Sequence, residues 1–303
     1  MIRLDAATVL LQWAVGGLFF LWVTTRRRAV GLGYGWLLRG TYALVAAGAI
    51  AAGRLGDPVP VRDGAAVGVL LATIAALVVS VRRRGAGVTG QQVEHDRRSA
   101  RVAAMTGISR HVTDPPKREP LEVGTAGTEP TSKTSRKVRR EFDPRLDLAA
   151  PVIGVVGLVA AGMASGGADV LAVARTLAGA AFLGSITDAM LLGHWYLVQP
   201  GLPRRLLLEL VAWLGWVWPV EVGLLLVPTG MASVLSGTID DGWGGTLGWM
   251  WVACAVTTIA LVFVTRAALR ERYYSAVMAA TGLLYLAILT AFGTDLVARA
   301  VLA

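Results

Sequence analysis

Cysteine and histidine are scarce in this chain of 303 residues, which contains one cysteine and three histidines. Its single cysteine, Cys254, excludes an internal disulfide and a cysteine-rich metal site. Two of the three histidines, His95 and His111, lie in a polar segment, which leaves His194 as the only one in an apolar run. A haem held between two histidines within this chain is thereby excluded. A haem at His194 would need its second ligand from methionine, another residue or a second subunit.

The sequence also lacks the residue clusters that identify several classes of enzyme. It contains no H-E-x-x-H motif, no pair of cysteines, no carboxylate–histidine cluster and no defensible Ser–His or Cys–His spacing. "GAGVTG" at 85–90 matches the letters of the dinucleotide-binding motif, but it follows an apolar run and an arginine triplet instead of a strand. That context favours a flexible linker. We therefore predict no cofactor, no metal and no catalytic residues, and nothing in the sequence supports an enzyme.

Charge is scarce, and it is unevenly placed. Charged residues make up 16% of the chain, against about 25% in soluble domains. Hydrophobic residues reach 55% and the mean hydropathy is +0.59. The net charge is +9, but the basic residues stand at the ends of apolar runs, which indicates membrane topology and not a nucleic-acid partner. We predict an all-α, polytopic integral membrane bundle.

Eight apolar runs are long enough to cross a bilayer, which takes roughly 17–25 residues. The first is a retained span and not a signal peptide, because it is long, no small-residue cleavage site follows it, and its arginines come after it. The predicted spans are residues 6–24, 33–53, 65–81, 148–165, 169–198, 205–227, 246–265 and 273–292.

Arginine collects at alternate connections, and lysine and arginine are retained on the cytoplasmic side of a membrane. The arginine-rich connections follow the first, third, fifth and seventh spans, and the connections between them carry few basic residues. We therefore predict that both termini lie outside and that segment 82–147 is cytoplasmic. The Ala-, Gly-, Val- and Arg-rich composition is typical of a GC-rich bacterial genome, which would make the membrane a bacterial plasma membrane.

The chain divides into a three-span membrane segment (1–81), a polar segment (82–147) and a five-span membrane segment (148–303). The polar segment is poor in aromatic residues and rich in Gly, Pro, Ser and Thr, so we predict that it is disordered. Its 15 Lys and Arg against 9 Asp and Glu leave a net charge of +6. We expect it to contact anionic lipid headgroups or a protein partner in a membrane complex.

Six ionisable residues lie within predicted spans. Each costs roughly 2.5–3.5 kcal/mol at mid-membrane depth, so such residues usually face the bundle interior and have a partner or a function. They form the candidate intramembrane polar site: Arg39, Arg175, Asp188, His194, Glu209 and Glu221.

Depth along the predicted helices suggests partners for four of these residues. His194 and Glu209 stand at similar distances from the turn "QPGLP", so they could form an imidazole–carboxylate pair, or each could reach headgroups or water. Ala180, Gly184 and Asp188 share one helix face, where small residues allow another helix to approach closely. Asp188 would then face the bundle, and we propose Arg39 as its partner, in a structural or a mechanistic ion pair.

Glu221 follows Pro219, which predicts a helix kink beside a carboxylate, and Arg175 could reach it from the preceding span. The residues then form a polar seam between the fifth and sixth spans. One interpretation is that protons or a small solute pass along this seam. A second is that the chain is a non-catalytic subunit or assembly partner of a larger, respiratory-type membrane complex. A third, a membrane enzyme for a lipid-linked substrate, lacks a catalytic cluster.

Overall fold

The computed structural model describes residues 4–86, 88, 141–165, 169–199, 201–227, 230–271 and 273–302. Within these ranges the chain forms helices and no β-strands, and eight helices are long and apolar enough to cross a membrane. The predicted fold class, a polytopic helical membrane bundle, is confirmed. Most of the polar segment 82–147, with His95, His111 and half of the "GAGVTG" match, lies outside the described residues.

The eight long helices follow the predicted spans, most with ends that shift by a few residues. They are α1 (Ala6–Thr25), α2 (Leu32–Leu55), α3 (Pro60–Arg82), α5 (Ala149–Ala164), α6 (Asp169–Val198), α7 (Arg205–Leu226), α9 (Thr246–Arg270) and α10 (Tyr274–Val301). Three short elements connect them: η1 (Arg84–Ala86), η2 (Pro144–Leu148) and α8 (Met231–Leu235).

The largest difference from prediction is at the end of α10, which continues to Val301 where the predicted span stops at residue 292. The additional turns contain Asp295 and Arg299, which interrupt the apolar run. Both side chains are nonetheless buried, and Arg299 Nε donates to Asp295 Oδ2 at 2.8 Å. An ion pair four residues apart lies on one helix face, so the helix can continue without exposing either charge to lipid.

Local sequence explains where several helices begin. The carboxylate of Asp5 accepts hydrogen bonds from the backbone N–H groups of Ala7 and Thr8, both at 3.2 Å, and so caps α1. Pro60 occupies the first turn of α3, where its missing N–H has no intrahelical partner to lose. At the start of α9, Asp241 accepts from four backbone N–H groups, those of Trp243, Gly245, Leu247 and Gly248.

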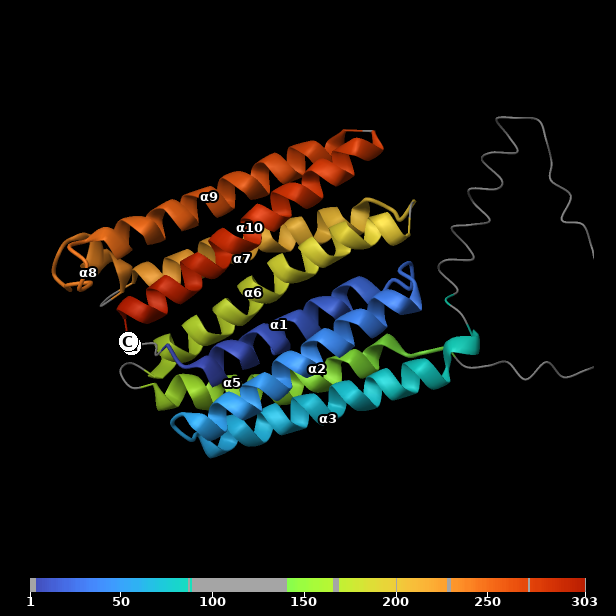
Figure 1. Ribbon diagram of the computed structural model, residues 1–303, viewed down its shortest axis with the longest axis horizontal. Helices are drawn as coiled ribbons and strands as arrows, with labels where there is room; N and C mark the ends of the chain where they lie inside the picture. Colours follow the sequence, from blue (N-terminus) through green and yellow to red (C-terminus); the bar gives the residue numbers. More distant parts are fainter. Residues whose placement is uncertain are drawn as a thin grey trace, which may run out of the picture.

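Helix α6 is the centre of the bundle, in contact with α1, α5, α7 and α10 (Figure 1). On one side of it, α1 packs against α2 and α5, and α3 packs against α2 and α5. On the other side, α10 packs against α9, and α7 packs against α9. Helices from before and after segment 82–147 therefore share one packed interior.

The crossing of α1 and α6 is unusually close. A Cβ atom built on Gly184 would lie only 2.6 Å from the Cα of Gly16 and would overlap other backbone atoms of that residue. The predicted small-residue face of α6 is thus confirmed, and α1 is the helix that approaches it. Asp188 lies one turn beyond Gly184 and is fully buried, as that face requires.

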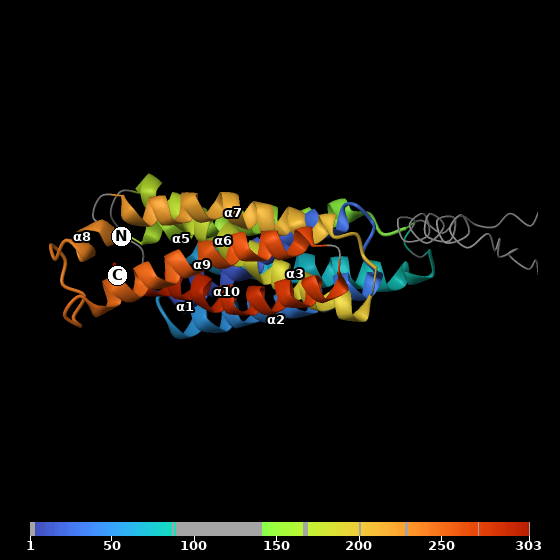
Figure 2. The same cartoon turned by 90° about the horizontal axis from the view of Figure 1, so that it is seen from above.

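Both termini lie at one end of the bundle, which we call the terminal end (Figure 2). The arginine-rich connections lie at the opposite end, which we call the basic end. There Arg26 and Arg27 pair with Glu209 at 2.5 and 3.0 Å, and Arg28 pairs with Glu141 at 2.9 Å. The predicted segregation of basic connections to one end is therefore present in the fold. The assignment of that end to the cytoplasm stays a prediction.

Large apolar side chains cover the outside of the helices. More than half of the surface of each is exposed at Leu44, Leu71, Trp216, Phe263 and Leu289. Side chains of this kind are stable at a protein surface only where hydrocarbon replaces water. The outer surface therefore contacts the lipid bilayer.

Candidate functional site

Four of the six residues of the predicted site are buried, and two are not. Arg39, Arg175, Asp188 and Glu221 each expose 2% or less of their surface. His194 is exposed at the bundle surface, and Glu209 is partly exposed at the basic end. The structure brings none of the predicted pairs together as an ion pair.

The predicted pair of Arg39 with Asp188 is wrong, because Arg39 pairs with Asp147. Its Nε and Nη2 atoms donate to Asp147 Oδ1 and Oδ2 at 2.8 and 2.7 Å, and both side chains are almost fully buried. Thr25 adds a hydrogen bond to Asp147 at 3.2 Å. A guanidinium binds both oxygens of a carboxylate in this way with defined geometry. Asp147 was missed because it stands at the polar segment's last position, just before an apolar run.

Asp188 instead accepts a hydrogen bond at Oδ1 from the hydroxyl of Tyr42 on α2. No salt bridge involves Asp188 within the described residues, and its second oxygen has no hydrogen-bond partner there. Tyr34 lies about two turns before Tyr42 on α2, and its buried hydroxyl is near the side chain of Thr24. We call Asp188, Tyr42 and Tyr34 the middle cluster.

The predicted pair of His194 with Glu209 is also wrong. His194 faces α10, where its Nδ1 lies 3.4 Å from the hydroxyl of Tyr285. Glu209 faces the end of α1, where it pairs with Arg26 and Arg27 in the connection that follows that helix. The two residues do stand near the same turn, but the rotation of each helix about its axis directs them to different neighbours. Hydropathy patterns along the chain report the depth of a residue better than this rotation.

Arg175 does not form the predicted ion pair with Glu221, although the two charges lie near enough to interact. Its Nε donates to the carbonyl of Leu224 at 2.9 Å and its Nη2 to that of Val227 at 3.1 Å. Helix α7 ends at Leu226, so these carbonyls lack intrahelical partners. A cation at this position satisfies them and complements the negative end of the helix dipole. Arg175 therefore caps α7.

A second group of buried polar residues surrounds Gly179 of α6, and sequence analysis did not identify it. A Cβ atom at Gly179 would lie 2.8 Å from Gln12 Nε2, 2.9 Å from Asp295 Oδ1 and 3.2 Å from Arg299 Nη2. Polar groups from α1 and α10 thus converge on one short stretch of α6 backbone. Gln12 also donates to the carbonyl of Thr176 at 2.6 Å. The sequence does contain one indication of this group, because Asp295 and Arg299 are four residues apart and can therefore pair on one helix face.

Glu221 of α7 completes this group, because its nearest charged neighbours are Asp295, Arg299 and Arg175. We call Gln12, Gly179, Glu221, Asp295 and Arg299 the terminal cluster. Gln12 Oε1 and Arg299 Nη2 are buried without a hydrogen-bond partner among the described residues, and the carboxyl groups of Glu221 and Asp295 lie within hydrogen-bonding reach of each other, where they can share a proton. Buried polar groups are nearly always paired, so these atoms provide unused capacity for a proton, water or a polar solute.

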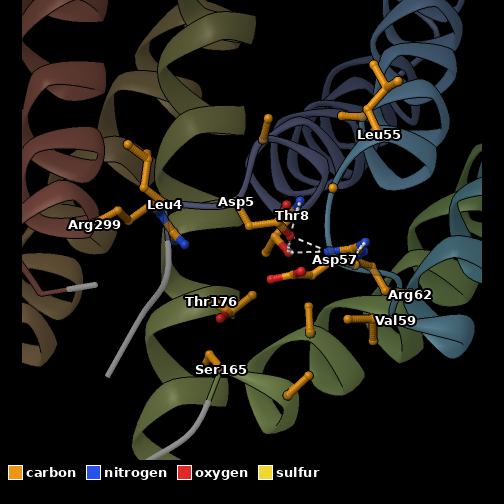
Figure 3. A pocket seen from close by; sticks show the side chains of 15 residues that line it. Leu4, Asp5, Thr8, Leu55, Asp57, Val59, Arg62, Ser165, Thr176 and Arg299 are labelled. Atoms are coloured by element: carbon orange, nitrogen blue, oxygen red, sulfur yellow. Dashed lines mark hydrogen bonds and ion pairs between the residues drawn. The ribbon is translucent and has the colours of Figure 1, made fainter.

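A cavity of about 540 Å³ leads to the terminal cluster from the terminal end (Figure 3). Its wall includes Arg299 and Thr176 on one side and Asp5, Asp57 and Arg62 on the other. Arg62 is buried and forms salt bridges with Asp5 and, at 2.8 Å, with Asp63. Arg299 belongs both to this wall and to the buried cluster, so it connects the cavity with the bundle interior.

The polar residues do not form one continuous seam between α6 and α7. Asp188 follows Gly179 by nine residues on α6, about 13 Å at 1.5 Å per residue. The stretch between them carries buried apolar residues and the Gly16–Gly184 contact. The terminal cluster, the middle cluster and the Arg39–Asp147 pair are therefore separate, and they use α1, α2 and α10 as well as α6 and α7.

Most of the molecule is thus a helical membrane bundle, and its buried polar groups include the terminal cluster, which adjoins the cavity of about 540 Å³. Function belongs to such sites and not to the fold alone. Comparison of the chain with protein-family models, with curated proteins and with solved structures found no match.

Proposed function

We propose that this multi-pass membrane protein moves a small polar solute together with protons across the membrane. The single observation that carries the proposal is the position of Arg299. Its side chain is 1% exposed and holds Asp295 through Nε, and its unpartnered Nη2 belongs to a side chain that lines the cavity. One guanidinium thereby belongs both to a buried ion pair and to the wall of the cavity, and its Nη2 atom, which is buried against Gly179, would become accessible to a solute when that wall moves.

Competition for Arg299 would link the two movements. An acceptor oxygen of a solute that reaches the guanidinium after this movement would draw it away from Asp295. Asp295 and its neighbour Glu221 then share less positive charge, and two carboxylates close together cannot both stay ionised at low cost. A proton taken up by this pair replaces the cation as its partner. Solute and proton would bind together and leave together.

Passage further into the bundle would require movement at the crossing of α1 and α6. There the Gly16–Gly184 contact separates the terminal cluster from Asp188, whose Oδ2 is the next buried polar atom of α6 without a hydrogen-bond partner among the described residues. Helices that contact through glycine have smooth surfaces that can slide past each other, as in shear motions of packed helices. The terminal half of the bundle would then open and close around a fixed site, as in alternating access.

Proton entry into reconstituted vesicles tests the proposal. Vesicles with the full chain and an internal pH-sensitive dye are exposed to the small-solute fraction of a cell extract, recovered as its dialysate, under an inward proton gradient. We expect internal acidification that depends on the extract and falls to the level of empty vesicles in Glu221→Gln and Asp295→Asn. Asp240→Asn, a neutralised acid on an exposed loop at the same end, is the matched control and should transport normally.

Equal incorporation and equal thermal unfolding of each variant must be verified, so that lost flux reflects the carboxyl groups and not the fold. Acidification that persists in the double variant Glu221→Gln/Asp295→Asn would contradict the proposal. Absence of any flux with the unchanged protein would also contradict it, and would favour the alternative of a non-catalytic subunit in a larger membrane complex.

A further inference from the structure

Helices α7 and α9 form an exposed surface at the basic end of the bundle. The two helices pack against each other in opposite directions, and Figure 1 shows the start of α7 and the end of α9 at the same end of the molecule. Arg204 Nη2 donates to the carbonyl of Tyr273 at 2.8 Å, which joins the start of α7 to the connection that follows α9. Residues at these two helix ends are therefore neighbours in space.

One contact between the two helices sets their register. A Cβ atom built on Gly215 of α7 would lie 3.7 Å from Cγ1 of Val262 on α9. Because the helices are antiparallel and rise equally per residue, a step toward the start of α7 matches an equal step toward the end of α9. Arg270 follows Val262 by eight residues and is therefore level with Leu207, eight residues before Gly215. Arg205 is two residues further along.

Three arginines lie on one side of this helix pair: Arg205 on α7, and Arg266 and Arg270 on α9. Counted from Gly215 at about 100° per residue, Arg205 is rotated by about 80° from the line that joins the two helices. Counted from Val262, Arg266 and Arg270 are rotated by about 40° and 80°. These rotations lead away from the buried leucines of α7 and from the side of α9 that contacts α10. All three arginines are accordingly exposed.

The positive charge of this surface is largely unpaired. No hydrogen bond or ion pair involves Arg205, Arg266 or Arg270 within the described residues. Glu209 lies one turn after the first of them, but its two oxygens pair at 2.5 and 3.0 Å with arginines of the α1–α2 connection. Glu271, which is exposed next to Arg270, is the remaining acid of these two helix ends among the described residues. Three arginines against one acid attract an anion.

Aromatic side chains continue the surface toward the middle of the membrane. Trp216 follows Arg205 by eleven residues, about three turns, so the two share a face of α7. Phe263 precedes Arg266 by three residues on α9. Each of these aromatic side chains exposes more than half of its surface. A zone of positive charge at the helix ends is thus followed by an apolar zone, as at the boundary between lipid headgroups and hydrocarbon.

We propose that this surface, formed by Arg205, Trp216, Phe263, Arg266 and Arg270 and called the α7–α9 lipid site, binds an anionic phospholipid whose headgroup carries no ammonium group. The phosphate accepts hydrogen bonds from Arg266 and Arg270, with Arg205 beside it, since guanidinium groups bind phosphate oxygens two at a time. The acyl chains lie along Trp216 and Phe263. This inference does not depend on the proposed function.

The composition of the site favours this ligand over two others. A soluble anion would be attracted by the arginines but would leave Trp216 and Phe263 without a contact. A phospholipid with a choline or ethanolamine headgroup would bring a further cation toward three arginines, which costs affinity. Anionic phospholipids are concentrated in the cytoplasmic leaflet, where basic sites between helices bind their headgroups. The basic end is the end predicted to face the cytoplasm, so the lipid and the site would meet there.

Binding to the purified full chain in a neutral detergent tests the inference. The probes are phosphatidylglycerol, phosphatidylcholine with the same acyl chains, and glycerol phosphate, which has the phosphate of the first lipid without its chains. A ligand that binds only the folded state raises the unfolding temperature as its concentration increases. We expect a saturable increase with phosphatidylglycerol, a much smaller one with phosphatidylcholine and none with glycerol phosphate at the same concentration.

Removal of two arginines tests the position of the site. Arg266→Gln/Arg270→Gln should weaken the affinity for phosphatidylglycerol about 25-fold, because each arginine near an anionic lipid surface contributes roughly fivefold. Arg82→Gln/Arg84→Gln is the matched control, since it also removes two exposed arginines at the basic end, on α3 and η1. It should leave the affinity nearly unchanged. Both variants should unfold without lipid as the unchanged protein does, because the substituted side chains are exposed.

Removal of the neighbouring acid should have the opposite effect. Glu271→Gln takes away the negative charge next to Arg270, so the affinity for phosphatidylglycerol should rise by about fivefold. Asp240→Asn, an exposed acid at the terminal end, is the control and should not change the affinity. A gain in affinity cannot result from a damaged fold.

Three results would overturn the inference. Phosphatidylcholine or glycerol phosphate that binds as well as phosphatidylglycerol would remove the selectivity for an anionic lipid. Equal losses in Arg266→Gln/Arg270→Gln and Arg82→Gln/Arg84→Gln would show a diffuse attraction to the basic end in place of a site between α7 and α9. Unchanged affinity in Glu271→Gln would show that the phosphate does not lie beside the end of α9.

Discussion

Gly16 of α1 and Gly184 of α6 contact each other through their backbones at the centre of the bundle, and neither position has room for a side chain. A methyl group on either glycine would push α1 and α6 apart. This contact joins helices from before and after segment 82–147, and it lies between the terminal cluster and Asp188. The crossing therefore determines both the packing of the bundle and the separation of its polar groups.

Gly184→Ala should lower the stability of the bundle by about 1–3 kcal/mol, the usual cost of an overpacked core. Thermal unfolding in detergent measures this effect. Gly282→Ala in α10 is the matched control, because a Cβ atom there would meet no neighbour within 4 Å. Alanine favours a helix over glycine, so the control should keep or raise stability. Equal unfolding temperatures for Gly184→Ala and Gly282→Ala would show that the two helices do not pack as described.

The buried pair of Arg39 and Asp147 provides a second prediction. Asp147→Ala leaves a guanidinium in the bundle without its carboxylate, so stability should fall by about 3–5 kcal/mol. Arg39→Met combined with Asp147→Leu should recover most of that loss, because both charges are then absent. Unfolding of Arg39→Met, of Asp147→Leu and of the double variant forms a double-mutant cycle that isolates the pair.

The pair of Arg28 with Glu141 is the comparison for this cycle. The side chain of Arg28 is 44% exposed, and an exposed pair of this kind contributes about 0–1 kcal/mol. Glu141→Ala should therefore have little effect on unfolding. A loss with Glu141→Ala as large as that with Asp147→Ala would contradict the burial of the Arg39–Asp147 pair.

The sequence predicts the depth of residues in this molecule better than their neighbours. Apolar runs and the placement of arginine indicate the spans and the end of the bundle that each connection occupies. Arg39 was expected near Asp188, but its partner is Asp147, which hydropathy assigns to the polar segment. Asp295 and Arg299 were missed for the same reason, since they end an apolar run. A charge neutralised within the fold has the same sequence signature as a charge in water.

A third prediction concerns pH and the start of α9. Partial removal of Asp241 from water raises the pKa of its carboxyl, but hydrogen bonds from the backbone N–H groups of Gly245, Trp243, Gly248 and Leu247 outweigh this and lower the pKa below its ordinary value. A carboxyl with a lowered pKa in the folded state stabilises that state fully above its unfolded pKa, about 3.9. The contribution is lost as the pH falls through the folded pKa.

Asp241→Asn should therefore reduce the unfolding temperature at neutral pH, and the difference from the unchanged protein should shrink below about pH 4. Thermal unfolding across a pH series measures this difference in unfolding temperature. Asp240→Asn is the control, because Asp240 accepts one backbone hydrogen bond, from Gly242. A difference that grows on acidification would reverse the sign and contradict the capping role.

The orientation of the bundle is the last prediction, and it determines from which side the cavity is entered. Cys254 is the only cysteine, so Cys254→Ala gives a background in which single cysteines report position. Asp240→Cys at the terminal end should react with a membrane-impermeant maleimide added to intact cells, whereas Arg84→Cys at the basic end should react only after the cells are opened. The expected labelling follows from the arginine-rich connections, which predict that the basic end is cytoplasmic. The opposite labelling pattern would show that the bundle has the reverse orientation in the membrane. The cavity would then open toward the cytoplasm.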